Sequence, residues 1–453
     1  MSQPGPPYSP APLSVSHKSV LAIALPIMAS NVSEPLIGIV DTWVVGRLHD
    51  ATYIGAVAIG AMIFSFIFWG FGFLRMGTGG MTAQAVGARD GVELRAVLGR
   101  ALLIAGSCGL GLIALSPAIE SISFWMVGAS ENVEVHARKY FEIRIFAAPF
   151  SLANYVFLGW FIGLGKARTA FFLQLLLNIS NMLLDAYFVL VMGMTSDGVA
   201  LGTVGASIIA SIAGAWAVQR ELKRRGGAWS WPSTLNPARL KRTVAVNADI
   251  MVRSLALVFA FSWFTAQGAK SGDIVLAANA VLMNIMLVGT YLIDGFAFSA
   301  ETLVGQAVGA RSIERFRASV RMSTLWAYAV AALLSLGIYV TGDALIDILT
   351  VNQDVRETAR DYLPWAALCP VIGVGCFQLD GIFIGATQTS DMRNMMLVSL
   401  VLYIAAWWVL TPLLGNHGLW ISLLVFFIVR GVTLWSRMPA IERDRFSAQP
   451  ESV

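Results

Sequence analysis

Long apolar stretches constrain the fold of this chain more than any other feature of its sequence. They occupy residues 53–74, 101–115, 145–165, 169–193, 243–267 and 396–413. Several of them reach the ~20 residues that a helix needs to cross a bilayer. Only 13% of the residues are charged, against roughly 25% in soluble domains. The sequence therefore predicts an all-α integral membrane protein.

Hydropathy predicts about twelve transmembrane helices and an orientation. The helices are expected near 18–46, 53–77, 96–116, 138–164, 169–193, 199–221, 242–267, 275–300, 318–341, 360–386, 393–413 and 417–437. Lys and Arg gather in alternate loops, such as 89–100, 220–242 and 311–321. Because positively charged loops stay in the cytoplasm, both termini are expected there. The N-terminal stretch "MSQPGPPYSPAPLSVSHKS" is interpreted as a disordered tail and not as a cleaved signal peptide.

An internal repeat organises the chain. The hexapeptide "QAVGAR" occupies 84–89 and again 306–311, and the same shift aligns "FIG" at 161–163 with "FIG" at 383–385. One shift that serves several places indicates a duplication. Each copy contains about six spans. An even number of spans returns the chain to the side of the membrane where it started, so the two copies are parallel repeats, as in alternating-access transporters. The predicted order is a cytoplasmic tail (1–17), an N-lobe (18–221), a cytoplasmic linker (222–241), a C-lobe (242–437) and a cytoplasmic tail (438–453).

Polar residues inside the predicted spans point to a cation site in the first lobe. Asp41 lies in the apolar run "LIGIVDTWVVGRL", where a charge costs about 2.5–3.5 kcal/mol. Asn178, Asn181 and Asp185 share one helical face by their spacing, and Thr203 is expected at a similar depth. Two carboxylates at one site favour the uptake of a cation, so these residues predict a site for H⁺ or Na⁺. The alternative is a hydrogen-bonded cluster that only fixes helix packing.

The first span also carries two prolines, Pro26 and Pro35. A proline removes a backbone hydrogen bond and kinks a helix. Pro26 is therefore a candidate hinge, although a merely packed proline is the alternative. Glu34, beside Pro35, is a candidate for a further ligand or a residue that faces the cavity.

The second lobe has acids of its own, Asp294, Glu301 and Asp380. They are candidates for binding a cationic substrate, with a place at the membrane interface as the alternative for Glu301. The shift of the repeat puts Trp263 and Trp407 where the first lobe has its two aspartates. The ionisable residues inside the membrane are thus expected to be acids, which favours cationic cargo.

Several stretches together resemble the multidrug and toxic compound extrusion (MATE) family, and within it the DinF-like branch. They are "PLIGIVDTWVVGRL", "GWFIGLGKAR", "NISNMLLDAYFV", "GVALGTVGAS", "LDGIFIGATQTSDMRN" and "DGFAFSAETLVGQAVGAR". The resemblance implies two six-helix lobes that export organic, often cationic, compounds in exchange for H⁺ or Na⁺. It implies a cation site at Asp41, Asn181, Asp185 and Thr203, and a first helix that bends at the position of Pro26. Ile37 replaces a tyrosine found in some members, and this leaves the choice between H⁺ and Na⁺ open.

The predicted function is a cation-coupled antiporter in the inner membrane, monomeric and without a cofactor, for small organic substrates. The alternative is a flippase for lipid-linked oligosaccharides, which would need Arg or Lys inside its cavity. An enzyme is not expected, because no H-x-x-x-H, G-x-S-x-G or P-loop motif occurs. A net charge of only +4, with the basic residues in short loops, argues against binding of nucleic acid.

Overall fold

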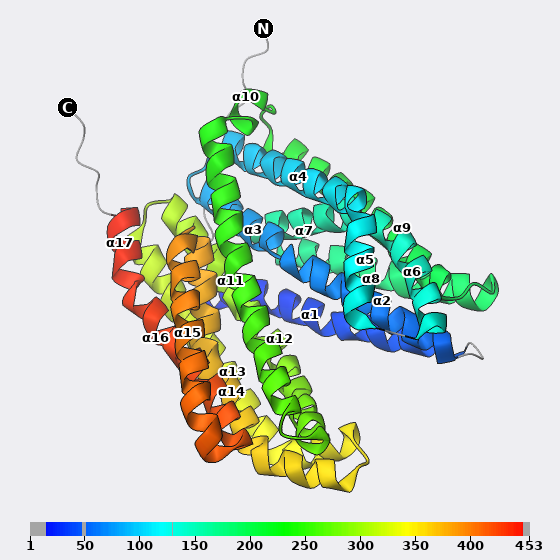
Figure 1. Ribbon diagram of the computed structural model, residues 1–453. Coiled ribbons are helices and arrows are strands. Elements are labelled where there is room, and N and C mark those ends of the chain that lie inside the picture. The colour runs from blue at the N-terminus through cyan, green and yellow to red at the C-terminus, as the bar shows by residue number, and fades with distance from the viewer. Residues whose placement is uncertain (1–14, 48–50, 129, 447–453) are drawn as a thin grey trace. The chain divides into compact units, whose positions relative to one another are not determined.

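The computed structural model describes residues 15–47, 51–128 and 130–446, and these residues form helices and no strand (Figure 1). The helices of the first half are α1 (His17–Val45), α2 (Ala51–Gly70), α3 (Phe73–Gly87), α4 (Gly91–Ala114), α5 (Ser116–Val127), α6 (Glu131–Arg144), α7 (Ala148–Gly163), α8 (Ala167–Ala186) and α9 (Ser196–Arg225). Those of the second half are α10 (Trp231–Thr234), α11 (Pro237–Ala269), α12 (Asp273–Gly309), α13 (Ile313–Leu349), α14 (Gln353–Gly385), α15 (Thr389–Leu414), α16 (Asn416–Ser436) and α17 (Met438–Phe446). A 3₁₀ turn, η1 (Ile145–Ala147), joins α6 to α7, and a π-helical turn, η2 (Tyr187–Val191), extends α8.

The number of membrane-spanning helices agrees with the sequence. Eleven stretches of the described residues are long and apolar enough to cross a membrane, and α1, with 29 residues, is long enough as well. The prediction of about twelve transmembrane helices is confirmed. The helices extend beyond the predicted spans at their ends. For example, α12 and α13 have 37 residues each, and each is therefore about 55 Å long at the usual helical rise. Hydropathy detects only their apolar middle, because their ends carry polar residues.

Local backbone chemistry interrupts two of the predicted spans. The expected span 53–77 is divided between α2 and α3 near Gly72, and η1 interrupts 138–164 just before Pro149. Proline lacks a backbone N–H, so it fits the first turn of α7, where that N–H would have no partner within the helix. The short helix α5 was not predicted, and it likewise has Pro117 in its first turn.

The chain forms two compact units, each with its own core. Unit 1 contains Ala29–Ala85 and Asp90–Val244, and unit 2 contains Val86–Arg89, residues 245–446 and α1 as far as Met28. Buried aromatic side chains pack inside both units, among them Phe64, Phe124, Tyr140 and Phe141 in unit 1, and Phe264, Tyr403, Trp420, Phe426 and Phe427 in unit 2.

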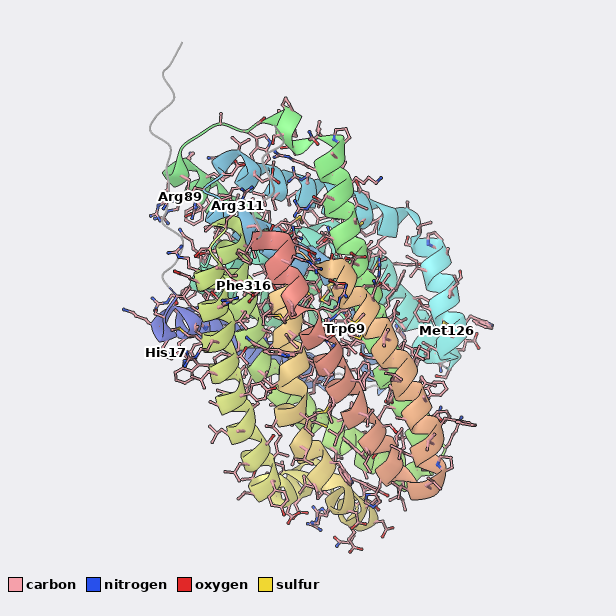
Figure 2. All side chains as sticks on the ribbon, turned by 90° about the vertical axis from the view of Figure 1, so that its left-hand side faces the viewer. His17, Trp69, Arg89, Met126, Arg311 and Phe316 are labelled. Carbon is pink, nitrogen blue, oxygen red and sulfur yellow. The ribbon has the colours of Figure 1, made fainter. Side chains whose placement is uncertain are left out.

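Four turns show the internal duplication in the backbone itself. Arg89 and Arg311, which end the two "QAVGAR" copies and are labelled in Figure 2, have φ of 57° and 50°. Gly165 and Thr387, which the same shift relates, have φ of 74° and 50°. Positive φ is uncommon for a residue with a side chain. Matching exceptions in one register confirm that the repeat seen in the sequence is a structural repeat.

Close helix contacts recur in the same register. A Cβ added at Gly159 would lie 2.2 Å from the backbone oxygen of Arg75, and one added at Gly381 would lie 2.2 Å from that of Ala297. Glycine permits this approach because it has no side chain. One turn later, the distances are 2.4 Å for Gly163 with Gly79 and 2.4 Å for Gly385 with Glu301. Both lobes therefore use one internal packing scheme, as parallel repeats should.

The segment expected as a linker, 222–241, is folded against unit 1. It contains the end of α9, all of α10 and the start of α11. Arg100 of α4 donates a hydrogen bond to the backbone oxygen of Ser233 at 3.0 Å. Glu93 pairs with both Arg100 and Arg239. These ion pairs and hydrogen bonds hold the segment in place.

The segment expected as a C-terminal tail begins with a packed helix, α17. Arg317 donates to both carboxylate oxygens of Glu442, at 3.0 and 2.7 Å. Phe446 packs on Phe316, which is labelled in Figure 2, with ring centroids 5.2 Å apart. Residues 438–446 are thus attached to the start of α13.

Candidate functional site

A buried carboxylate, that of Asp185, lies at the contact of α8 with α9 in unit 1. Asp185 is 0% exposed. Asn181, one turn earlier on α8, donates Nδ2 to Oδ2 of Asp185 at 2.8 Å and to Oγ1 of Thr203 at 3.3 Å. Thr203 in turn donates to the backbone oxygen of Val199 at 3.1 Å. The structure thus brings together three of the residues expected in the first lobe's cation site.

Gly202 sets the separation of α9 from this carboxylate. A Cβ at this position would lie 1.9 Å from Oδ1 of Asp185 and 2.9 Å from its backbone nitrogen. Any larger residue would have to displace the carboxylate or part the two helices. The glycines of "GVALGTVGAS" are expected to permit close packing, and Gly202 does so at the site itself.

Asn178 connects the polar face of α8 to α1. Its Nδ2 donates to Oγ of Ser33 at 2.8 Å, and its Oδ1 accepts from Nε2 of Gln174 at 3.0 Å. Gln174 is not among the predicted site residues. It lies four residues before Asn178 and so extends the same helical face by one turn. The spacing in the sequence would have been sufficient to find it.

Two of the predicted site residues, Asp41 and Glu34, lie on α1, and their side chains are outside the described residues. The helix itself continues without a break through Pro26. Its residues up to Met28 belong to unit 2, and those from Ala29 onward belong to unit 1. Pro26, which cannot donate a backbone hydrogen bond, therefore lies directly before the point where α1 changes units.

In unit 2, Asp380 of α14 is buried between two arginines. Nη2 of Arg253 on α11 and Nη2 of Arg430 on α16 both donate to Oδ2 of Asp380. The expectation that the ionisable residues inside the membrane are acids is therefore wrong. Each arginine is the single charge of an apolar run, "IMVRSLALVF" and "FFIVRGVTLW". A single charge within an apolar run indicates a functional residue whether the side chain is basic or acidic. The two arginines could therefore have been identified from the sequence.

The other two acids of unit 2 lie on α12. Asp294 is partly buried and interacts electrostatically with Arg430. Glu301 is 2% exposed and lies seven residues further along, about 10 Å from Asp294 at the usual helical rise. Its side chain is therefore buried.

Comparisons with known proteins agree with this architecture. The family model MatE matches residues 26–187 and 250–409, and the shift of the repeat relates the ends of the two matched segments, 187 and 409. A solved structure described as the outward-facing conformation of a multidrug resistance MATE family transporter has a TM-score of 0.85. It is 18% identical and covers 98% of this chain and 100% of its own.

Two relatives match over nearly their whole length. DNA damage-inducible protein F of Escherichia coli (strain K12) is 40% identical over 436 residues, which are 94% of this chain and 93% of that protein. A probable multidrug resistance protein NorM of Caulobacter vibrioides is 25% identical, over 97% of this chain and 94% of that protein. The chain therefore belongs to the MatE family of multidrug and toxic compound extrusion (MATE) proteins, which are membrane transporters and not enzymes.

Proposed function

We propose that this transporter exports organic compounds by alternating access in exchange for H⁺ or Na⁺, which binds where Asp185 meets Asn181 and Thr203. The observation that carries the proposal is the fully buried carboxylate of Asp185, hydrogen-bonded to Asn181 at 2.8 Å. An ionisable group inside a membrane helix is costly, and such groups are typically functional. Carboxylate, amide and hydroxyl oxygens are the ligands of hard cations. Asn178 links this site to Ser33 of α1.

Asp41 is the second carboxylate of the proposed site. The internal repeat supports its place near Asp185, because the shift of the repeat carries the two aspartates to Trp263 and Trp407. These tryptophans contact each other in unit 2, with ring centroids 5.0 Å apart. Equivalent positions in a structural repeat have equivalent neighbours. Two carboxylates in one place favour the binding of a cation between them.

A bend of α1 at Pro26 would link ion binding to transport. The first part of α1 is attached to unit 2, where Nε1 of Trp326 donates to Nδ1 of His17 at 3.0 Å (His17 is labelled in Figure 2). Asp41 lies on the part that belongs to unit 1. A bend at the proline therefore changes the position of Asp41 relative to the anchored start of the helix.

The proposal places the protein in the inner membrane as a monomer, with both termini in the cytoplasm and no nucleic-acid partner. The lobes would span 18–221 and 242–437. The orientation is supported by the Lys- and Arg-rich segments 89–100, 220–242 and 311–321.

Asp294, Glu301 and Glu34 are the proposed contacts for a cationic group of the cargo. Asp294 is favoured because its side chain is only partly buried. Asp380 was the fourth candidate from the sequence, but two guanidiniums contact its carboxylate. Its attraction for a further cation is weak, because its charge is already compensated.

A flippase for a lipid-linked oligosaccharide or another lipid-linked precursor is the second candidate function. One observation favours it, the buried pair Arg253 and Arg430. Guanidiniums bind phosphate groups with two parallel hydrogen bonds, and an anionic head group would require such side chains.

Export of ethidium from proteoliposomes, with H⁺ and Na⁺ gradients imposed separately, tests the lead function. We expect one of the two gradients to drive export by the wild-type protein, and Asp185→Asn to abolish it. Asp361→Asn is the matched control, because Asp361 is exposed on α14, and it should export like the wild type. Export by Asp185→Asn at the wild-type rate, or no response to either gradient, would contradict the proposal.

A further inference from the structure

Two buried arginines of unit 2 converge on a single oxygen atom. Arg253 comes from α11, Arg430 from α16 and Asp380 from α14, so three helices supply the charges. Both guanidiniums use Nη2, and both reach Oδ2 of Asp380. Neither forms the parallel two-bond pairing with the carboxylate, which is the stronger arrangement for a guanidinium.

Several polar atoms of this triad lack partners. Within the described part of the chain, no hydrogen bond is made by Nε of Arg253, by Nε and Nη1 of Arg430, or by Oδ1 of Asp380. The side chain of Arg430 is 0% exposed, and those of Arg253 and Asp380 are 9% and 6% exposed. Leaving charged donors unpaired away from water is costly. An additional acceptor at this place would satisfy them.

The charges around the triad also favour an anion. Two guanidiniums contact one carboxylate, which leaves an excess of one positive charge among the groups in contact. Asp294 of α12 also acts on Arg430 electrostatically and offsets part of this excess. The thiol of Cys376, one turn before Asp380, donates to the backbone oxygen of Gly373 at 3.1 Å. Neither group supplies an acceptor to the free guanidinium atoms.

Aromatic rings form a wall beside the arginines. The guanidinium of Arg430 lies over the ring of Phe377, 5.6 Å from its centroid. Phe377 packs on Phe427 at 5.6 Å, and Phe427 packs on Phe261 at 6.5 Å. Phe377 and Phe261 are only partly buried. Aromatic surface with a few converging polar groups is typical of sites for small organic ligands.

We propose that Arg253 and Arg430 form a site for the carboxylate of an exported organic acid with an aromatic or other apolar body. The incoming carboxylate replaces Asp380 at Nη2 and also reaches a free Nε or Nη1, which gives the two-bond pairing that Asp380 does not make. This inference rests on the proposed function, because it names a substrate class of the same transporter. It extends the cargo from cations to compounds that carry a small monoanionic group.

Equilibrium binding of radiolabelled benzoate to the purified transporter in lipid nanodiscs tests this site. We expect saturable binding to the wild type, competition by unlabelled benzoate and no competition by benzamide, which has the same ring without the charge. Arg430→Gln should weaken binding roughly tenfold or more, because charge-assisted hydrogen bonds are lost. Asp380→Asn should strengthen it by roughly tenfold, because the internal competitor for both guanidiniums has lost its charge.

Arg393→Gln is the matched control, since Arg393 pairs with Asp249 outside the triad, and its affinity should equal that of the wild type. If Asp380→Asn does not fold, Arg430→Lys is the deciding variant. It keeps the positive charge but loses the planar guanidinium that can form two parallel hydrogen bonds, so it should bind benzoate more weakly than the wild type. No saturable binding to the wild type, or equal binding by Arg430→Gln, would overturn the site. Chloride binding with which benzoate does not compete would overturn the substrate class. No gradient is present, so this result is independent of ethidium export.

Discussion

Replacement of Gly202 by alanine adds one carbon atom at the tightest contact of the proposed ion site. The new Cβ would lie 1.9 Å from Oδ1 of Asp185, whereas ordinary van der Waals contacts begin at 3.4 Å. The carboxylate must therefore move away from α9 until it reaches that distance. The backbone nitrogen of Asp185, at 2.9 Å, is also too close. Rotation of the aspartate side chain alone is therefore insufficient, and α8 and α9 must separate.

The magnitude follows from two opposing effects. Overpacking of a close-packed interior lowers the free energy of unfolding by about 1–3 kcal/mol. Replacing glycine by alanine within a helix raises it by about 0.5–1 kcal/mol. We expect a net loss of roughly 1–2 kcal/mol in the free energy of unfolding. The effect on transport should be larger, because the hydrogen bond from Asn181 of α8 to Thr203 of α9, now 3.3 Å long, cannot survive a separation of the two helices. Gradient-driven export should fall by at least about tenfold, the equivalent of 1.4 kcal/mol.

Export from proteoliposomes and unfolding in mixed micelles measure these two effects. The matched control is Gly106→Ala on α4, where an added Cβ meets no atom within 4 Å, and it should export normally and be slightly more stable. Gly205→Ala is a second control on α9 itself, since it meets only the end of the Leu184 side chain, at 2.9 Å. Normal export and stability for Gly202→Ala would refute the reasoning.

Three further predictions concern other parts of the chain. Asp41→Asn should abolish coupled export at unchanged expression, because removal of a charge eases membrane insertion; undiminished drug resistance in cells would contradict this. Asp294→Asn should change the preference among organic cations by roughly 1–3 kcal/mol and leave ion binding intact, as competition assays can show. Glu442→Gln should lower the free energy of unfolding by no more than about 1 kcal/mol, because its pair with Arg317 is largely exposed; a larger shift of the unfolding midpoint would show that α17 is essential to unit 2.

Features that depend on local sequence could be predicted. The spans follow from the length of apolar runs, and the repeat follows from a shared register that the turns at Arg89 and Arg311 also obey. The polar face of α8 was predicted as well, because helical spacing alone places Asn178, Asn181 and Asp185 on one side.

Features that depend on tertiary pairing or on local breaks could not be predicted. Arg253 is 127 residues from Asp380 and Arg430 is 50 residues from it, and no periodicity connects the three. Hydropathy and helical spacing identify an acid inside a span, but they do not show which basic side chains of other helices compensate its charge. The break between α2 and α3 was missed for another reason, since a hydropathy window averages over the few residues between Gly70 and Phe73.

Ion binding to the purified transporter in the absence of cargo tests the central claim most directly. Proton release and ²²Na⁺ binding can be measured on the wild type, Asp185→Asn and Asp294→Asn in the same lipid nanodiscs. We expect the wild type to bind one of the two ions, Asp185→Asn to lose that binding and Asp294→Asn to retain it. Retained binding in Asp185→Asn together with its loss in Asp294→Asn would place the coupling ion in unit 2 and contradict the account.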